Sequence, residues 1–265
     1  MLRISNQQLR KTKFRSWRKI LKMDNEQKQQ SLIEHLEDLK SCLQSSFIGI
    51  LVGAVCCFYL AEEIFNIIRG PIEPLLPGGS LIYTGPLDKI IAYLKIAVIS
   101  GVVVSTPWWV YQIWKFVAPG LYKNEKRFSV KFVAAGTSLF VLGVGFSYFI
   151  VLPMALKFLL NFGAPQDKPM ISINEYLSFF LQITLIFGVA FELPLVLATL
   201  ALLGIISAEF LRQYRRYAVV IMSVLSAIIT PPDLLSMVLM LVPMIFLYEA
   251  SIFVVWMLEK NRKIT

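Results

Sequence analysis

The chain has 265 residues, of which 57% are hydrophobic, with a mean hydropathy of +0.66 and a formal net charge of +9. This apolar fraction exceeds the roughly 45–50% that is usual for soluble domains, so the composition excludes an ordinary soluble protein. No recognisable nucleic-acid-binding module accompanies the basic excess, which argues against nucleic acid as the partner.

Six apolar runs along the chain predict membrane-spanning helices. The first four reach the ~20 residues that cross a hydrocarbon core of about 30 Å. We therefore expect an all-α, polytopic membrane protein with six spans. The predicted spans are 43–61, 90–111, 130–152, 176–202, 217–230 and 234–256.

Basic residues gather on one side of these spans. Of 26 Lys and Arg residues, 10 precede the first span, 5 lie in 115–131, 3 in 203–216 and 3 after residue 258. The positive-inside rule makes this side cytoplasmic, so both termini are expected there. Three segments follow: a basic cytoplasmic extension at 1–30, one membrane domain at 31–258 and a cytoplasmic tail at 259–265. The net charge then reflects topology and contact with anionic lipid.

The segments between spans carry their own signals. Ser31 and Glu34 form a capping box, which predicts a helix that begins there and runs into the first span. The outer loop 62–88 is rich in Pro and Gly, which predicts a shaped cap that interrupts helices. The second outer loop, 153–175, is expected to carry a short amphipathic helix at 154–162.

Prolines and short runs predict a bent, concave bundle. Pro107, Pro194 and Pro243 each remove a helical hydrogen bond, which favours a kink or tolerated packing proline at each position. The fifth span is only 14 residues, and the sixth run has 15 residues before Glu249 interrupts it. Two such short helices should thin the surrounding bilayer or tilt their neighbours.

Glu192 lies in the middle of the fourth span, where an acid costs about 3 kcal/mol on insertion scales. A retained intramembrane acid predicts a function. From the residues alone, Glu192 is either a proton carrier or a docking point for a polar partner group.

Enzymatic and metal-binding functions are not expected. His35 is the only histidine, so a Ser-His dyad and His-rich metal sites are excluded. Cys42, Cys56 and Cys57 lack a CxxC spacing and are interpreted as apolar filler. We expect no catalytic residues, no metal and no cofactor.

The cytoplasmic loop after the second span sets an acid among bases. Glu125 lies between Lys123 and Lys126–Arg127, and Glu37 and Asp38 are expected at the same depth. Paired carboxylates are natural acceptors for a guanidinium group. The alternative is that Glu125 pairs with its own basic neighbours.

Four motifs in register resemble the TatC family, the multispanning receptor subunit of the twin-arginine protein translocase. They are HLEDLK (35–40), FVAPGLYKNEKR (116–127), FGVAFELP (187–194) and TPPD (230–233). The resemblance covers residues 31–258.

The resemblance implies a role for each motif. It places twin-arginine signal-peptide binding at Glu125, Asp38, Lys40, Leu43, Phe116, Lys126 and Arg127. It makes Glu192 the intramembrane functional acid, and it places partner-subunit docking at Thr230, Asp233 and Met237.

Four positions depart from the family pattern. Asp38 stands where glutamate is usual, and Lys40 where arginine is usual. Cys42 replaces a common basic residue, and Met237 replaces a frequent glutamine.

The resemblance also implies the partners and the setting. These are TatA/TatB-type single-span proteins, twin-arginine signal peptides of folded precursors, membrane lipid and further copies of the chain in a larger receptor complex. Export would use the protonmotive force across a bacterial inner membrane, or an organelle membrane of bacterial descent. The alternative function is a proton-coupled small-molecule transporter with Glu192 as proton carrier, which predicts inverted repeats that the sequence does not show.

Overall fold

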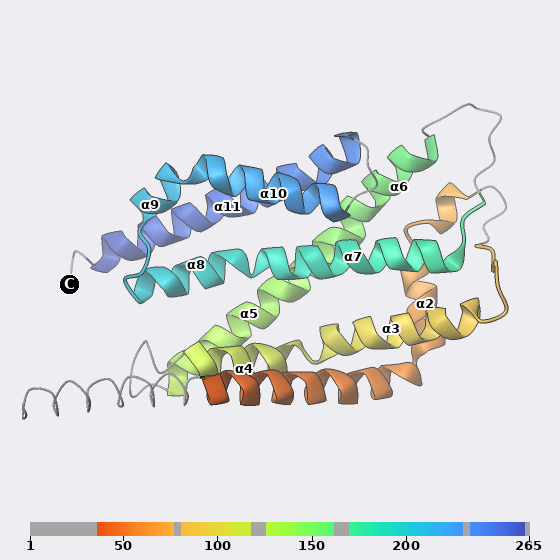
Figure 1. The fold of residues 1–265 in the computed structure, drawn as a ribbon, viewed down its shortest axis with the longest axis horizontal. Helices are drawn as coiled ribbons and strands as arrows, with labels where there is room; N and C mark the ends of the chain where they lie inside the picture. The colour runs from red at the N-terminus through yellow and green to blue at the C-terminus, as the bar shows by residue number, and fades with distance from the viewer. Residues whose placement is uncertain (1–35, 77–80, 118–125, 162–169, 230–233, 263–265) are drawn as a thin grey trace, which may run out of the picture. The chain divides into compact units, whose positions relative to one another are not determined.

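The computed structural model describes residues 36–76, 81–117, 126–161, 170–229 and 234–262, and most of the chain within these ranges is helical (Figure 1). The described parts contain no strand, only an isolated bridge between Ile82 and Ser172. The all-α prediction is confirmed. The chain divides into two compact units, Met1–Ser45 and Ser46–Thr265; of the first unit, residues 36–45 are described and form the start of a helix.

The first helix is Leu36–Phe58. The helices that follow are α2 (Ala61–Arg69), the 3₁₀ turn η1 (Glu73–Leu75), α3 (Asp88–Val104), α4 (Thr106–Val117), α5 (Lys126–Phe146), the π-helix η3 (Ser147–Val151), α6 (Leu152–Asn161), α7 (Ile173–Phe191), α8 (Leu193–Leu202), α9 (Ala208–Gln213), α10 (Arg215–Ile229) and α11 (Leu234–Arg262).

Four of the described helices are long and apolar enough to cross a membrane, and the bent pair α3–α4 would make a fifth. The polytopic prediction is therefore confirmed. α10 has only 15 residues, about 22 Å at 1.5 Å per residue, as expected for a short fifth span. The count of six spans, the cytoplasmic termini and the concave shape stay predictions.

Two of the three prolines mark breaks. α3 and α4 meet at Ser105 with a bend of 55°, just before Pro107. α7 ends at Phe191 and α8 begins at Leu193, so Glu192 occupies the junction and Pro194 lies in the first turn of α8. A proline is tolerated in a first turn because its missing N–H would lack a helical acceptor anyway.

The bend at Ser105 has its own hydrogen bonds. Pro107 cannot donate to the carbonyl of Val103, and the Thr106 hydroxyl donates to that carbonyl instead at 2.7 Å. The Trp109 indole N–H donates to the Val102 carbonyl at 3.1 Å. Side chains therefore satisfy the carbonyls that the broken helix leaves open.

α11 covers the predicted sixth span and extends beyond it. It runs as one helix of 29 residues, contains Pro243 without a break and continues past Glu249 into the predicted tail. Glu249 interrupts the apolar run of the sequence but not the helix, and its carboxylate pairs with Arg215 of α10 at 2.6 Å.

The outer loop 62–88 was expected to interrupt helices, and this is wrong for its first part. α2 is helical because Ala61, Phe65 and Ile68 recur at helical spacing and bury one face. The Pro- and Gly-rich remainder begins only after Gly70.

The predicted helix at 154–162 exists but does not stand alone. α5, the π-helix and α6 form one continuous apolar helix over Val130–Asn161, 32 residues long. Pro153 therefore lies inside this continuous helix, just after the π-helix Ser147–Val151, and causes no break.

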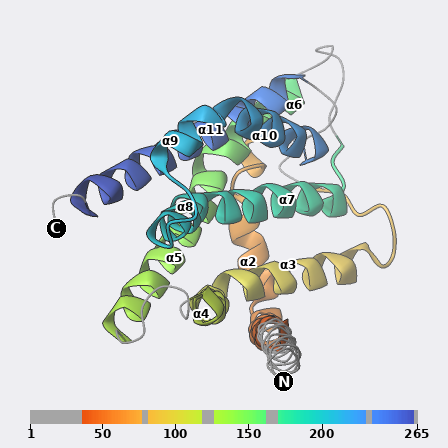
Figure 2. The same cartoon turned by 60° about the vertical axis from the view of Figure 1, so that its left-hand side comes forward.

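α5 and α7 cross at very short range (Figure 2). A methyl group on Gly143 would lie 2.5 Å from the Phe187 carbonyl oxygen, and one on Gly188 would lie 2.7 Å from the Phe140 ring. Glycines at both contact points let the backbones approach, as is usual between helices in membranes.

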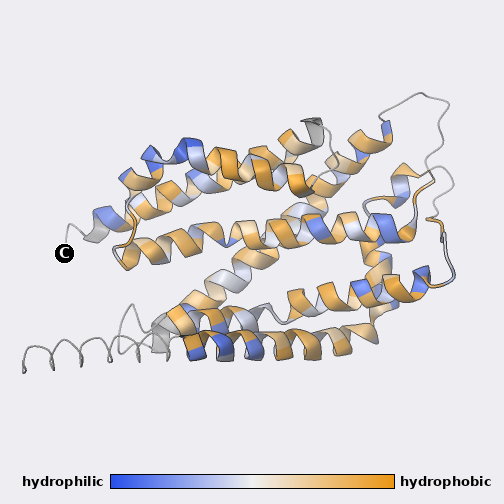
Figure 3. Ribbon diagram, viewed as in Figure 1, coloured by the Kyte–Doolittle hydropathy of each residue, from blue (hydrophilic) through white to orange (hydrophobic). Residues whose placement is uncertain are grey.

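α9 was not anticipated from the sequence and is held by α11. Ser207 caps it by accepting a hydrogen bond from the N–H of Phe210, and Glu259 accepts from the N–H of Ala208 at 2.9 Å. Figure 3 shows hydrophilic residues at α9 and at the distant end of α11, with hydrophobic residues along the middle of α7, α8 and α10.

Candidate functional site

The Glu192 carboxylate is inserted between helices. Its Oε1 is buried and has no hydrogen-bond partner among the described residues. A methyl group on Gly136 of α5 would lie 3.4 Å from Oε2 and 2.8 Å from a methyl of Val110 of α4. The glycine thus makes room chiefly for Val110, and the Glu192 carboxylate lies beside it in ordinary van der Waals contact with α5. Oε1 lacks a donor among the described residues.

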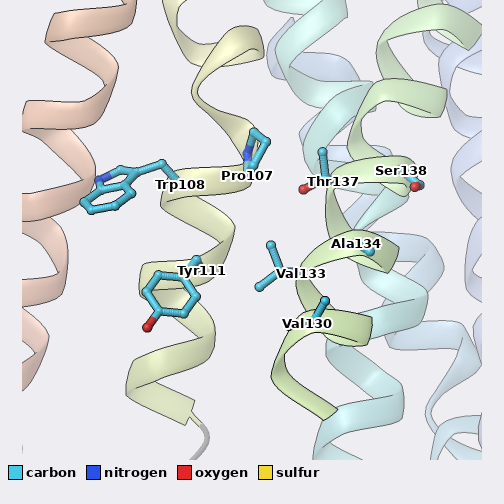
Figure 4. A pocket seen from close by; sticks show the side chains of 8 residues that line it. All are labelled: Pro107, Trp108, Tyr111, Val130, Val133, Ala134, Thr137 and Ser138. Atoms are coloured by element: carbon cyan, nitrogen blue, oxygen red, sulfur yellow. The ribbon is translucent and has the colours of Figure 1, made fainter. Parts of the chain in front are cut away.

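A groove lies between α4 and α5, with a volume of about 750 Å³ (Figure 4). Its lining residues are Pro107, Trp108, Tyr111, Val130, Val133, Ala134, Thr137 and Ser138. The Oγ1 atom of Thr137 is buried and, among the described residues, has no hydrogen-bond partner. Glu192 is not part of this lining, so the groove between α4 and α5 and the acid at the α7–α8 junction are separate features.

The scaffold of the loop that carries Glu125 is well defined. α4 ends at Val117 and α5 begins at Lys126, and the two helices pack together near these ends. The Trp114 ring stacks on the Phe132 ring with centroids 3.9 Å apart. This contact fixes both ends of the loop, although Glu125 itself lies outside the described residues.

The other predicted signal-peptide residues are only partly described. Phe116 is half-buried near the end of α4, and Lys126 and Arg127 open α5, with only their backbone described. Asp38 and Lys40 are exposed on the first helix, and the Leu43 side chain is 62% exposed. These three residues belong to the first compact unit, so their distance to the α4–α5 loop stays untested.

The predicted partner-docking residues are also only partly described. Thr230 and Asp233 lie outside the described residues. Met237 lies in the first turn of α11 and is partly buried. α10 and α11 pack side by side, so residues 230–233 connect two adjacent helices (Figure 2).

The sequence analysis missed a polar network between α3 and α7. Lys95 donates to the Ser178 hydroxyl at 2.8 Å and to the Asn174 carbonyl at 3.4 Å. The Asn174 amide donates to Asp88 at 2.7 Å. Lys95 within an apolar run was the available signal, but its partners are 79 and 83 residues away and have no local pattern.

Asp88 extends this network to the preceding turn. It accepts from the backbone N–H groups of Thr84 and Gly85, both at 2.7 Å, and from the Thr84 hydroxyl at 2.8 Å. Next to it, the N–H of Ile82 donates to the Ile171 carbonyl at 3.0 Å, and the N–H of Ile173 donates to the Ile82 carbonyl at 3.0 Å. The starts of α3 and α7 are therefore joined by side chains and backbone.

Comparison with known proteins agrees with this architecture. The family model of the Sec-independent protein translocase protein TatC matches residues 34–243. Proteins of that name from Desulforapulum autotrophicum and Aquifex aeolicus are each 40% identical, over 87% and 88% of this chain and 86% and 97% of their own. The Escherichia coli protein is 36% identical over 84% of this chain and 87% of its own.

Two crystal structures of the twin-arginine translocase receptor TatC share the fold. Their TM-scores are 0.76 and 0.77 at 41% sequence identity, and each covers 83% of this chain and 97% or 99% of its own. The matched range includes the α4–α5 loop, Glu192 and the α10–α11 turn. The chain belongs to the TatC family of Sec-independent protein translocase proteins.

Proposed function

We propose that this chain is the core receptor component of the twin-arginine translocase in a bacterial inner membrane. It binds the twin-arginine signal peptides of folded precursors and organises TatA/TatB-type single-span subunits for export driven by the protonmotive force. The observation that carries this proposal is the FVAPGLYKNEKR loop set between two helices whose ends are pinned by the Trp114–Phe132 stack, in a chain of this family.

The arginine site would lie at this loop. Glu125 and Asp38 would each accept a guanidinium in bidentate hydrogen bonds, which arginine forms better than lysine. Phe116 and Leu43 would contact the apolar part of the signal peptide. Lys40, Lys126 and Arg127 would hold the carboxylates in place and repel misplaced cations.

Glu192 would meet a polar group of a partner helix. What supports this is the buried Oε1 atom, which lacks a partner among the described residues. A donor brought by a single-span subunit would relieve the cost of an unpaired buried carboxylate oxygen. Family membership favours this role over the rival function, a small-molecule transporter with Glu192 as proton carrier.

The turn between α10 and α11 would be the main partner-docking point. Thr230 and Asp233 would contact the end of the single-span helix, and Met237 would pack beside it. Further copies of the chain would join the same receptor complex. The shortness of α10 supports a contact here, because a short helix leaves part of the bilayer depth for another element.

Charge reversal tests the arginine site. Glu125→Lys should lower crosslinking of a twin-arginine peptide at least tenfold, because it replaces an attractive charge pair by a repulsive one. The matched control is Glu209→Lys, which reverses an exposed acid at the start of α9 and should leave crosslinking intact.

A peptide carrying two lysines in place of the arginines completes this experiment. It should crosslink poorly to the unchanged protein, because lysine cannot form the bidentate contact. Equal crosslinking of the Glu125→Lys and Glu209→Lys proteins would remove Glu125 from the site.

A further inference from the structure

The groove between α4 and α5 is open to its surroundings and has no assigned occupant. Most of its lining is apolar, and its volume of about 750 Å³ lies in the range of roughly 300–1,000 Å³ that is usual for ligand sites. In Figure 4, Pro107 and Val133 both lie in the space between the two helices, at different heights, whereas Trp108 points away from α5. An apolar chain could lie along this space.

Two lysines flank the end of the groove that is nearest the α4–α5 loop. Lys115 follows Tyr111 by four residues on α4, and Lys131 precedes Ala134 by three residues on α5, so each lies beside a lining residue. Both side chains are exposed, and neither forms an ion pair with a carboxylate of the described residues. The site thus combines an apolar channel with two exposed lysines at one end.

We propose that this groove binds one anionic phospholipid, with an acyl chain between α4 and α5 and the phosphate beside Lys115 and Lys131. The two lysines favour an anionic headgroup, because lysines near a membrane surface attract acidic lipid. Trp108 and Tyr111 are each about half exposed, at 49% and 43%, and aromatic residues of this kind commonly lie near lipid headgroups.

A flexible acyl chain of a lipid fits this groove better than a partner helix does. Helix contacts inside membranes favour small residues that let two backbones approach, as Gly143 and Gly188 do elsewhere in this fold. In the α4–α5 groove, the large aromatic side chains of Trp108 and Tyr111 stand on the α4 edge, and the small residues Ala134, Thr137 and Ser138 lie on the α5 edge alone. A lipid in this place would also brace the ends of the loop that carries Glu125.

Native mass spectrometry of the full chain in detergent tests the proposal, with added phosphatidylglycerol or phosphatidylcholine of identical acyl chains. The unchanged protein should retain one phosphatidylglycerol in preference to phosphatidylcholine. Ala134→Phe fills the groove and should abolish that retention. Ala135→Phe adds the same ring at the next, exposed position outside the lining and should not.

A double variant that removes both lysine charges tests the contact with the lipid headgroup. Lys115→Gln with Lys131→Gln should weaken phosphatidylglycerol binding by roughly tenfold and leave the weak phosphatidylcholine binding unchanged. Lys89→Gln with Lys157→Gln removes two exposed lysines far from the groove and serves as control. Thermal unfolding in detergent confirms that each variant is folded.

Mapping distinguishes the occupants. Phosphatidylglycerol with a photoreactive acyl chain should crosslink to peptides that contain Tyr111 or Val133. Equal lipid retention by Ala134→Phe and Ala135→Phe, equal binding of both lipids, or crosslinks confined to other helices would each overturn the proposal. Recovery of a single-span protein crosslinked in the groove of the native membrane would overturn it in favour of a partner helix.

Discussion

Lys95 and Glu192 are both charged residues inside predicted spans, and their surroundings differ. The Lys95 ammonium has two oxygen acceptors from α7, the Asn174 carbonyl and the Ser178 hydroxyl, and the Asn174 side-chain amide donates in turn to Asp88. Glu192 has one buried carboxylate oxygen with no partner among the described residues. Placing a charge in the membrane costs free energy in both cases. Hydrogen bonds within the chain offset this cost for Lys95, whereas the Oε1 atom of Glu192 leaves part of it uncompensated.

This contrast separates a structural charge from a binding charge. A charged group whose partners all come from its own chain belongs to the fold. Replacing both the charged group and its partners by apolar groups can leave the free energy of unfolding nearly unchanged. A group with a vacant hydrogen-bonding position gains its partner only when another molecule arrives. The following variants test that difference, from the largest expected effect to the smallest.

Glu192→Ala should reduce export of a twin-arginine reporter by roughly 10- to 100-fold, the equivalent of one lost hydrogen bond to a charged group. The thermal unfolding temperature should hardly change, because no described donor loses its acceptor. Glu192→Gln keeps one carbonyl acceptor and should retain part of the export.

Export assays and thermal unfolding of the same purified proteins distinguish the two roles. A Glu192→Ala protein that exports at the normal rate would make this acid structural. Crosslinking of the twin-arginine peptide should persist in Glu192→Ala, because the arginine site lies at the α4–α5 loop.

Asp88→Ala should lower the free energy of unfolding by about 1–3 kcal/mol. It leaves the N–H groups of Thr84 and Gly85 and the Asn174 amide without their acceptor, and water near the surface compensates part of this loss. Denaturation in detergent measures the change, with Glu175→Ala at the start of α7 as an exposed control. A neutral Asp88→Ala would show that the bridge at Ile82 alone holds this end.

Lys95→Met should change the free energy of unfolding by less than about 1 kcal/mol. Hydrogen bonds between membrane helices average about 0.6 kcal/mol, and the Ser178 hydroxyl keeps its own bond to the Asn174 carbonyl at 2.7 Å. Export should be retained. A large loss of export with normal stability would place Lys95 with Glu192 as a binding charge.

Local rules predicted part of the fold. Pro107 and Pro194 were expected to disturb their spans, and both breaks are present. Pro243 produces no break, because α11 packs on α8 and α10 along its length and this support compensates the missing bond. α2 and α9 were missed because their apolar faces are buried only against distant helices.

The sequence predicted which residue forms the candidate site, Glu192, but not which side chains surround it. The apolar run around Glu192 showed that an acid lies in the membrane, and the motifs gave its family. That its carboxylate lies against Gly136 of α5 depends on the packing of α5 against α7, between residues far apart in the sequence. The Asp88 network escaped prediction for the same reason.

The 55° bend at Ser105 has a consequence for how the protein tolerates its membrane. The open carbonyls of Val102 and Val103 are bonded by Thr106 and Trp109, so this corner requires neither water nor lipid headgroups to satisfy it. The corner can therefore lie in the hydrocarbon core without leaving these two carbonyls unpaired.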